Sequence, residues 1–235
     1  MAKRNKEAGR SVGAVDVSLD TKVKPSQARS QHTFEMILAV AGDLLAEVGF
    51  ERLSTNLVCQ RAGLTPPALY RYFPNKYAIL GELGRRLMEA QDQAVFDWIE
   101  GGGLEADTIE EAIDQNRRIQ ETVNQITRDM PGGVWILRAM RAVPLLQDIR
   151  IASRDKVARH TAERLLEQHP QSSTEEVYAA TRITTELMFA ATEMVLEEPD
   201  VDEALVTREV CSMVCLYYSR FVGGKAAPSS EGEPA

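Results

Sequence analysis

Apolar residues recur at intervals of three and four through most of this 235-residue chain, and this periodicity constrains the fold more than any other feature. Between Phe34 and Val48, for example, the apolar side chains return to one face of a helix. No stretch alternates apolar and polar residues with enrichment in β-branched side chains, and we find no internal repeat. The sequence therefore predicts an all-α protein.

Proline and glycine divide this pattern into about nine helices. The expected helices cover residues 26–48, 54–61, 66–73, 75–99, 105–129, 131–143, 145–168, 174–197 and 201–222. Residues 1–25 and 223–235 lack apolar periodicity and are rich in small and polar residues, so we expect two disordered tails.

The composition, with 44% hydrophobic residues, is that of a chain able to bury a sizeable core. No run of apolar residues reaches the length needed to span a membrane, and the N-terminal segment has no apolar stretch typical of a secretory signal. Three cysteines (Cys59, Cys211 and Cys215) are too few and too clustered for a disulfide framework. We therefore expect a cytoplasmic protein without a membrane partner.

Charge is distributed unevenly along the chain, although the formal net charge is −8. Residues 1–81 carry 11 Lys and Arg against 7 Asp and Glu, whereas residues 82–235 carry 16 against 28. This asymmetry suggests a basic interaction domain attached to an acidic body. A solvated tail alone is the other interpretation, because most of the basic surplus lies in the first 30 residues.

Two of the expected helices are short and are joined by a tight turn. Ser54 and Thr65 precede them as N-caps, Gly63 lies in the turn, and Pro66 takes the first helical position of the second helix. This is the form of a helix-turn-helix. Many helical proteins contain such a pair only for packing, so the form alone does not decide the function.

The amino acids of this segment are more specific than its form. Ala62-Gly63-Leu64-Thr65 is followed by Leu69-Tyr70-x-Tyr72-Phe73-x-x-Lys76-x-x-x-Leu80, and the motif covers about 27 residues. It resembles the DNA-binding signature of the TetR family of transcriptional regulators. The resemblance implies a homodimeric repressor of a palindromic operator on double-stranded DNA, released by a small-molecule effector. It also implies a helix-turn-helix DNA-binding domain at 26–81 and an effector-binding and dimerisation domain at 82–222, with a dimer interface made by the last two helices.

Each matching position has a physical reason to contact DNA. Hydroxyl, amide and backbone groups at the start of a helix suit phosphate, and small groups on the leading turn of the reading helix suit base edges. Arg71 is the best candidate for a guanine or phosphate contact, and we favour Tyr72 and Lys76 over Tyr70 for phosphate, although either tyrosine could belong to the core. Pro67 stands where the family commonly has glycine, so the operator of relatives with glycine does not transfer. The expected DNA-contacting residues are Thr55, Asn56, Thr65, Pro66, Pro67, Ala68, Tyr70, Arg71, Tyr72 and Lys76.

Aromatic residues, methionines and charged residues of the middle helices are candidates for an effector pocket, although such residues more often form core. The candidates are Trp98, Trp135, Arg138, Met140, Phe189 and Glu193. Cys211 and Cys215 lie four residues apart on the last helix and could form a redox pair, but we favour packing because a bridge between them would be strained.

Two other classes of protein are the alternatives. The chain has no metal-binding histidine spacing, no phosphate-binding loop and no nucleophile elbow, so we expect no enzyme activity, no metal and no cofactor. The second alternative is a helical protein-interaction module without sequence-specific DNA binding, in which the basic N-terminal part binds an acidic partner.

Overall fold

The computed structural model describes residues 17–23 and 27–222, and within these ranges it contains nine α-helices, one 3-10 turn and no strand. The all-α prediction is therefore confirmed. The helices are α1 (Ala28–Arg52), α2 (Thr55–Ala62), α3 (Pro66–Tyr70), α4 (Lys76–Glu100), α5 (Ile109–Asp129), α6 (Gly133–Ala142), α7 (Gln147–Gln168), α8 (Thr174–Glu197) and α9 (Glu203–Val222), with the 3-10 turn η1 at Pro144–Leu146.

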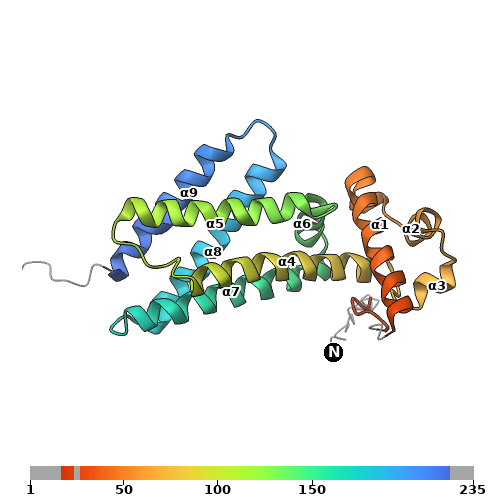
Figure 1. Ribbon diagram of the computed structural model, residues 1–235, viewed down its shortest axis with the longest axis horizontal. Helices are drawn as coiled ribbons and strands as arrows, with labels where there is room; N and C mark the ends of the chain where they lie inside the picture. The colour runs from red at the N-terminus through yellow and green to blue at the C-terminus, as the bar shows by residue number, and fades with distance from the viewer. Residues whose placement is uncertain (1–16, 24–26, 223–235) are drawn as a thin grey trace, which may run out of the picture.

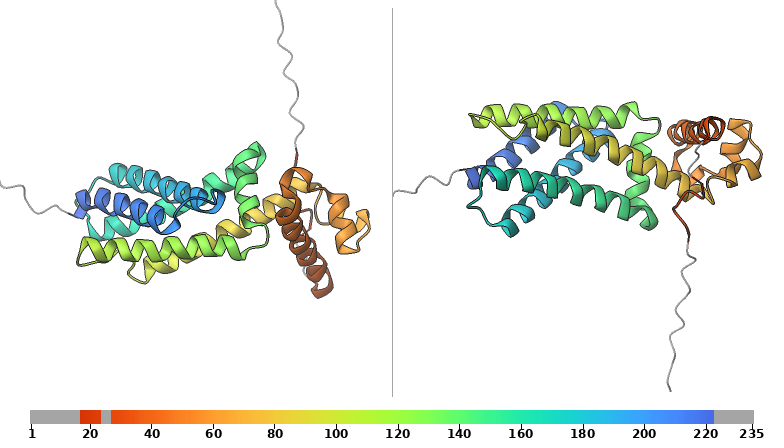
Figure 2. Two further views of the ribbon diagram at one scale, coloured as in Figure 1. Left: turned by 90° about the horizontal axis from the view of Figure 1, so that it is seen from above. Right: turned by 60° about the horizontal axis from the view of Figure 1, so that its bottom comes forward.

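The molecule is elongated, with two unequal parts (Figure 1). Helices α1–α3, which we call the head, form one end, and helices α4–α9, which we call the body, form the rest. Helix α4 begins beside the head and runs along the body, where it packs against α5 and α7, and α8 packs against both α7 and α9. The head projects from the same end of the body in both views of Figure 2.

Helix ends in and beside the head form where the sequence places capping residues. Ser54 Oγ accepts a hydrogen bond from the N–H of Leu57 at 3.2 Å, and Gly63 ends α2 in the left-handed conformation with φ 65°. Asn75 Oδ1 accepts from the N–H of Ala78 at 2.9 Å and so begins α4. These caps satisfy backbone groups that the helices leave open, which fixes the short turns on either side of α3.

Three helix boundaries differ from the expected ones by three residues or more. Helix α1 continues to Arg52 across a break at Gly49, whose φ of 73° marks the predicted stop. Helix α3 ends at Tyr70 instead of Phe73, because the chain turns at residues 71–72 before Pro74. Helix α5 begins only at Ile109, after Thr108 caps it through the N–H of Glu111.

The head meets the body at the start of α6, where glycine permits a close approach. A Cβ on Gly42 of α1 would lie 2.7 Å from the carbonyl oxygen of Pro131, and one on Gly132 would lie 2.6 Å from the carbonyl oxygen of Gly42. Gly132 also has a φ of 72°, which side chains disfavour. Helix α6 is therefore held against α1 by a contact that tolerates no side chain at either glycine.

Residues 17–23 lie in the segment that we expected to be a disordered tail, and they pack where the head joins α4. The N–H of Lys22 donates to the carbonyl of Tyr72 at 2.8 Å, and the side chain of Asn75 donates to the carbonyl of Ser18 at 3.0 Å. The predictions for residues 1–16, 24–25 and 223–235 fall outside the described residues. None of the described helices combines the length and the apolar character needed to cross a membrane.

Candidate nucleic-acid interface

Helices α2 and α3 are held on α1 by a small aromatic and aliphatic core. Val58, Leu69 and Phe73 are fully buried. The ring of Phe73 stacks on that of Phe34 of α1, with centroids 4.9 Å apart. A salt bridge between Arg61 of α2 and Glu47 of α1, at 2.7 Å, braces the same contact from outside, and its hydrogen bond lowers the pKa of Glu47. The buried face of α3 is thereby fixed, and its opposite face points outward.

The outward face of α3 carries the residues expected to meet base edges. Thr65, Pro66 and Pro67 are exposed and Ala68 is half-buried. Pro66 takes the first helical position, where a missing N–H costs no hydrogen bond, so the two prolines do not disrupt the helix. This surface is small and largely apolar, which suits contact with thymine methyl groups.

The beginning of α2 and the end of α3 are joined by one hydrogen bond on the surface. The hydroxyl of Thr55 lies 3.0 Å from the hydroxyl of Tyr70, although fifteen positions separate them in the chain. Asn56 is exposed beside Thr55. Two hydroxyls and the open N–H groups at the start of α2 therefore lie together, an arrangement able to bind a phosphate group.

Arg71 is exposed directly after α3. Its guanidinium lies 5.8 Å from the ring centroid of Tyr72, and among the described residues it forms no ion pair. Arg61, by contrast, is paired with Glu47. The five donors of the Arg71 guanidinium are thus available to a partner outside the chain.

Lys76 has a structural role that sequence reasoning missed. Its ammonium donates to the carbonyls of Phe50 and Glu51 at 3.3 and 3.4 Å, where α1 ends. A cation at this position stabilises the carbonyl end of a helix. Because an ammonium has three donors, this role leaves one for a phosphate.

The structure reverses the order in which we favoured the two tyrosines. Tyr72 is only 4% exposed and packs edge-on against Phe34, whereas Tyr70 is 39% exposed and bonded to Thr55. The turn that ends α3 after Tyr70 directs Tyr72 toward α1. Tyr70 is therefore the better candidate for a DNA contact.

Residues 37–83, which span α1 to the first part of α4, match the family described as bacterial regulatory proteins of the tetR family. The class C tetracycline repressor of Escherichia coli is 39% identical over 54 residues, and the class A repressor from transposon 1721 is 40% identical over 52 residues. These alignments cover 23% and 22% of this chain, and they span about a quarter of the length of each repressor. The chain carries the DNA-binding domain of the TetR family.

The similarity of this chain to solved structures of TetR-family regulators extends from the head through the body. A tetR-family transcriptional regulator from Streptomyces coelicolor superimposes with a TM-score of 0.59 at 13% identity, over 82% of this chain and 86% of that one. The fatty acid degradation regulator FadR from Bacillus halodurans gives a TM-score of 0.56 at 18% identity, over 82% of this chain and 96% of that one. At such identities these similarities show the fold alone.

The body encloses a small cavity of about 80 Å³ among α4, α5, α7, α8 and α9. Trp98 and Phe189, two of the six predicted pocket residues, line it. Trp135, Arg138, Met140 and Glu193 line neither this cavity nor the larger one beside it. Two of the six candidates thus lie on a cavity wall, and four lie elsewhere.

Three of these four residues belong to α6, which faces the head and α4 instead of the cavity. A Cβ on Gly49 would lie 3.2 Å from the ring of Trp135, and one on Gly84 would lie 2.9 Å from the sulfur of Met140. Arg138 lies over the Trp135 ring at 4.8 Å. Because α6 is apolar on more than one face, its sequence does not show which face packs against which neighbour, and tertiary packing decides this.

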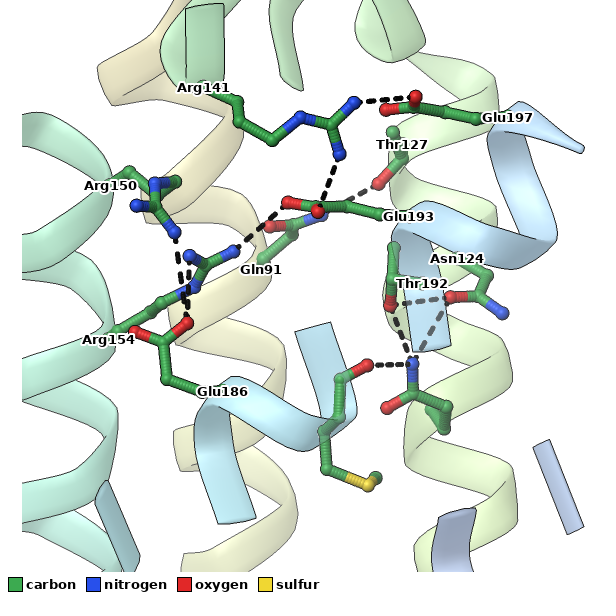
Figure 3. Close-up of polar contacts among 12 residues, drawn as sticks. Gln91, Asn124, Thr127, Arg141, Arg150, Arg154, Glu186, Thr192, Glu193 and Glu197 are labelled. Carbon is green, nitrogen blue, oxygen red and sulfur yellow. Dashed lines mark hydrogen bonds and ion pairs between the residues drawn. The ribbon is translucent and has the colours of Figure 1, made fainter. Parts of the chain in front are cut away.

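Glu193 belongs to an ion-pair network that joins α6, α7 and α8 (Figure 3). Arg141 of α6 lies 2.7 Å from both Glu193 and Glu197 of α8, and Arg154 of α7 lies 3.4 Å from Glu193 and 3.1 Å from Glu186. Arg154 is 2% exposed, so its charge depends on these carboxylates. The network connects the helix that contacts the head with the helix that lines the cavity.

The cysteines of α9 are structural. Cys211 and Cys215 are buried, and burial raises their pKa to about 12 and about 11, which disfavours the thiolate that redox chemistry requires. Within residues 17–23 and 27–222, no three His, Cys, Asp or Glu side chains cluster as metal ligands would.

Proposed function

We propose that this TetR-family chain is a homodimeric transcriptional repressor that binds a palindromic operator and is released by a small-molecule effector. The observation that carries the proposal is the outer surface of α2 and α3. There, Thr55 and Tyr70 are held together, and the guanidinium of Arg71 is exposed without an ion pair among the described residues. A surface of unpaired donors on a rigid core suits the phosphates and base edges of a duplex.

In this proposal α3 enters the major groove and residues 65–68 face the bases. Arg71 reads a guanine or holds a phosphate, while Thr55, Asn56 and Tyr70 position the backbone. Lys76 holds α1 and contributes charge, which raises affinity for any sequence. Tyr72 supports the site from the core.

Dimerisation is supported by exposed apolar residues on the last two helices. Ile183 of α8 is 62% exposed, and Met213 and Leu216 of α9 are 56% and 60% exposed. Large apolar side chains on neighbouring helices favour burial against a second copy. A two-fold dimer also supplies two reading helices, which an operator with two half-sites requires.

Control by an effector is supported by the contacts between cavity and head. Phe189 lines the cavity and lies 4.5 Å beneath the guanidinium of Arg154, which pairs with Glu193. Glu193 pairs with Arg141 of α6, and α6 packs on α1. A ligand that moves α8 changes these pairs, and it weakens operator binding only by its differential affinity for the two arrangements.

Selection of bound fragments from random DNA tests the proposal. The expected result is a palindrome with half-site centres about 34–36 Å apart, or a multiple of that distance, bound by a dimer. Sedimentation of the Met213→Lys, Leu216→Lys double variant, with Arg118→Lys on α5 as control, is expected to yield a monomer only for the former. Failure to enrich any sequence, also after refolding to remove bound ligands, would favour the interaction module instead.

A further inference from the structure

The cavity of the body adjoins a larger one. The inner cavity of about 80 Å³ and an outer cavity of about 530 Å³ share Leu104, Asn116 and Tyr218 as lining residues. The outer cavity lies between the 103–108 loop, the end of α7 and the end of α9. The two cavities therefore lie next to each other, and three side chains contact both.

The residues that line the inner cavity carry no formal charge. They are aliphatic, aromatic, hydroxyl and amide side chains, and apolar surface predominates. Tyr218 is also neutral, because burial raises its pKa and its hydroxyl bonds that of Thr184. An ion placed here would lose hydration without gaining a counter-ion from the lining, which strongly disfavours its entry.

The cation behind the inner wall does not offset this cost. Arg154 lies across the ring of Phe189 and is already paired with Glu186 and Glu193. The outer cavity is lined by Glu105, whose carboxylate pairs with Arg164 at 3.1 Å, and by Asp107, which forms no ion pair within the described residues. The uncharged inner lining and the carboxylate of Asp107 therefore oppose an anion most of all.

Several polar groups of the inner lining remain available to a ligand. Within the part of the chain that is described, no hydrogen bond is formed by the Thr185 hydroxyl or by the amide oxygens of Gln120 and Asn116. The Gln120 amide nitrogen, in contrast, donates to Thr192 at 2.6 Å and to the carbonyl of Met188 at 3.2 Å. One hydroxyl donor and one amide acceptor match a neutral oxygen function such as a hydroxyl group.

We propose that the effector is an uncharged, elongated and largely apolar molecule with a neutral oxygen group, and that the site rejects carboxylates of the same length. The inference rests on the proposed function, because it names the ligand class of that regulator. The proposed ligand is not an acidic lipid, although the fold resembles that of a fatty acid degradation regulator.

Binding of matched probes tests the ligand class. Hexan-1-ol, octan-1-ol and decan-1-ol are titrated into the full chain beside the carboxylates of the same lengths, with thermal shift and calorimetry as readouts. The best alcohol is expected to bind at least about tenfold more tightly than its carboxylate. A carboxylate that binds as tightly as the alcohol, or no binding of any alcohol, would overturn the proposal.

The two tryptophans locate the probe. In the Trp135→Phe variant the remaining Trp98 lines the cavity, and its fluorescence is expected to change with the alcohol. In the matched Trp98→Phe variant the remaining Trp135 lies outside the cavity against Gly49, so a smaller change than that of Trp98 is expected. A response of Trp135 alone would place the probe elsewhere and contradict the assignment, and the thermal shift of the unmodified chain decides the matter if either variant does not fold.

Two substitutions test the Thr185 hydroxyl and the Asp107 carboxylate. Thr185→Val keeps the shape and removes the hydroxyl, so alcohol affinity is expected to fall about two- to tenfold, whereas Thr122→Val on the exposed face of α5 leaves it unchanged. Asp107→Asn is expected to strengthen carboxylate binding. Equal alcohol affinity in both threonine variants would remove the assigned hydrogen bond.

Operator binding of the same preparation separates the two proposals. If the chain selects no DNA sequence, the proposed function fails whatever the probes do. If it selects an operator but prefers carboxylates, only the ligand class fails.

Discussion

The head and the body use their polar side chains in opposite ways. On the outer face of α2 and α3, Asn56 and Arg71 are exposed and have no side-chain partner among the described residues. In the body, Arg154 and Asn124 are buried, and each is bonded to side chains of another helix. The head therefore holds its shape with an apolar core and keeps its donors for an outside partner, whereas the body uses polar pairs to hold its own helices.

The core of the head gives the largest expected effect. Phe73 is fully buried against Phe34, so Phe73→Ala is expected to lower the free energy of unfolding by about 3–5 kcal/mol and to abolish DNA binding. Urea denaturation followed by circular dichroism measures the change. Ile151→Ala, at a 44% exposed position of α7, is the control and is expected to cost under about 1 kcal/mol. Similar losses in both variants would break the assignment of the head's stability to this core.

A buried carboxylate between α4 and α7 gives the next effect. Asp92 accepts a hydrogen bond from Ser153 at 2.6 Å, yet burial raises its pKa to about 6, above a value of about 3.9 in the unfolded chain. The folded state thus keeps the proton to higher pH than the unfolded state does. The contribution of Asp92 to stability therefore falls as the pH rises from about 4 to about 6 and stays low above that, by roughly 3 kcal/mol at most.

Asp92→Asn is accordingly expected to stabilise the protein at about pH 7 and to lose this advantage near pH 4. Urea midpoints across this range measure it, with Asp97→Asn on the exposed face of α4 as the control. A gain that does not depend on pH, or a loss at neutral pH, would show that the ionised form of Asp92 is well accommodated.

Helix α6 links the two regions, and Arg141 tests that link. Its ion pairs with Glu193 and Glu197 are partly exposed, so Arg141→Met is expected to change stability by under about 1 kcal/mol. In the Arg141→Met variant, the change that saturating decan-1-ol causes in the free energy of operator binding is expected to be smaller than in the unmodified chain by about 0.5–2 kcal/mol. Fluorescence anisotropy with and without the alcohol measures it. Arg118→Met on α5 removes an exposed pair with Asp114 and is expected to leave the coupling unchanged, and equal coupling in both variants would exclude Arg141 from the connection.

The two tyrosines give the smallest effect. Tyr70→Phe removes the hydroxyl bonded to Thr55, and operator affinity is expected to fall by about 0.5–1.5 kcal/mol for all sequences alike. Tyr72→Phe is the matched change at the buried position and is expected to alter affinity less. If Tyr72→Phe lowered operator affinity more than Tyr70→Phe does, Tyr72 would again be the better candidate for a phosphate contact.

The same contrast explains how much could be predicted from sequence. The turns of the head depend on local signals, so Ser54 and Gly63 act where their residue types indicate, although Thr65 precedes α3 without a capping hydrogen bond from its side chain. The burial of Tyr72 and the second role of Lys76 depend on how α1 crosses the head, which no local pattern contains. In the body, the apolar pattern of α6 predicted a helix correctly but not that it packs against Gly49 and Gly84. Neither the docking of residues 17–23 nor the charge-free lining of the cavity has a signal at the level of sequence.

The measurement that tests the central claim most directly is the base preference of Arg71→Ala. The variant and the unmodified chain are compared on every single-base change of the selected operator at two salt concentrations, with Arg118→Ala as the control for charge. We expect Arg71→Ala to lose about 1–3 kcal/mol at one base position in each half-site and to lose discrimination there, because an unpaired guanidinium beside α3 reads that base. Uniform weakening across all positions would reduce Arg71 to a phosphate contact, and no change at either salt concentration would contradict the account of the head as a surface of donors kept free for DNA.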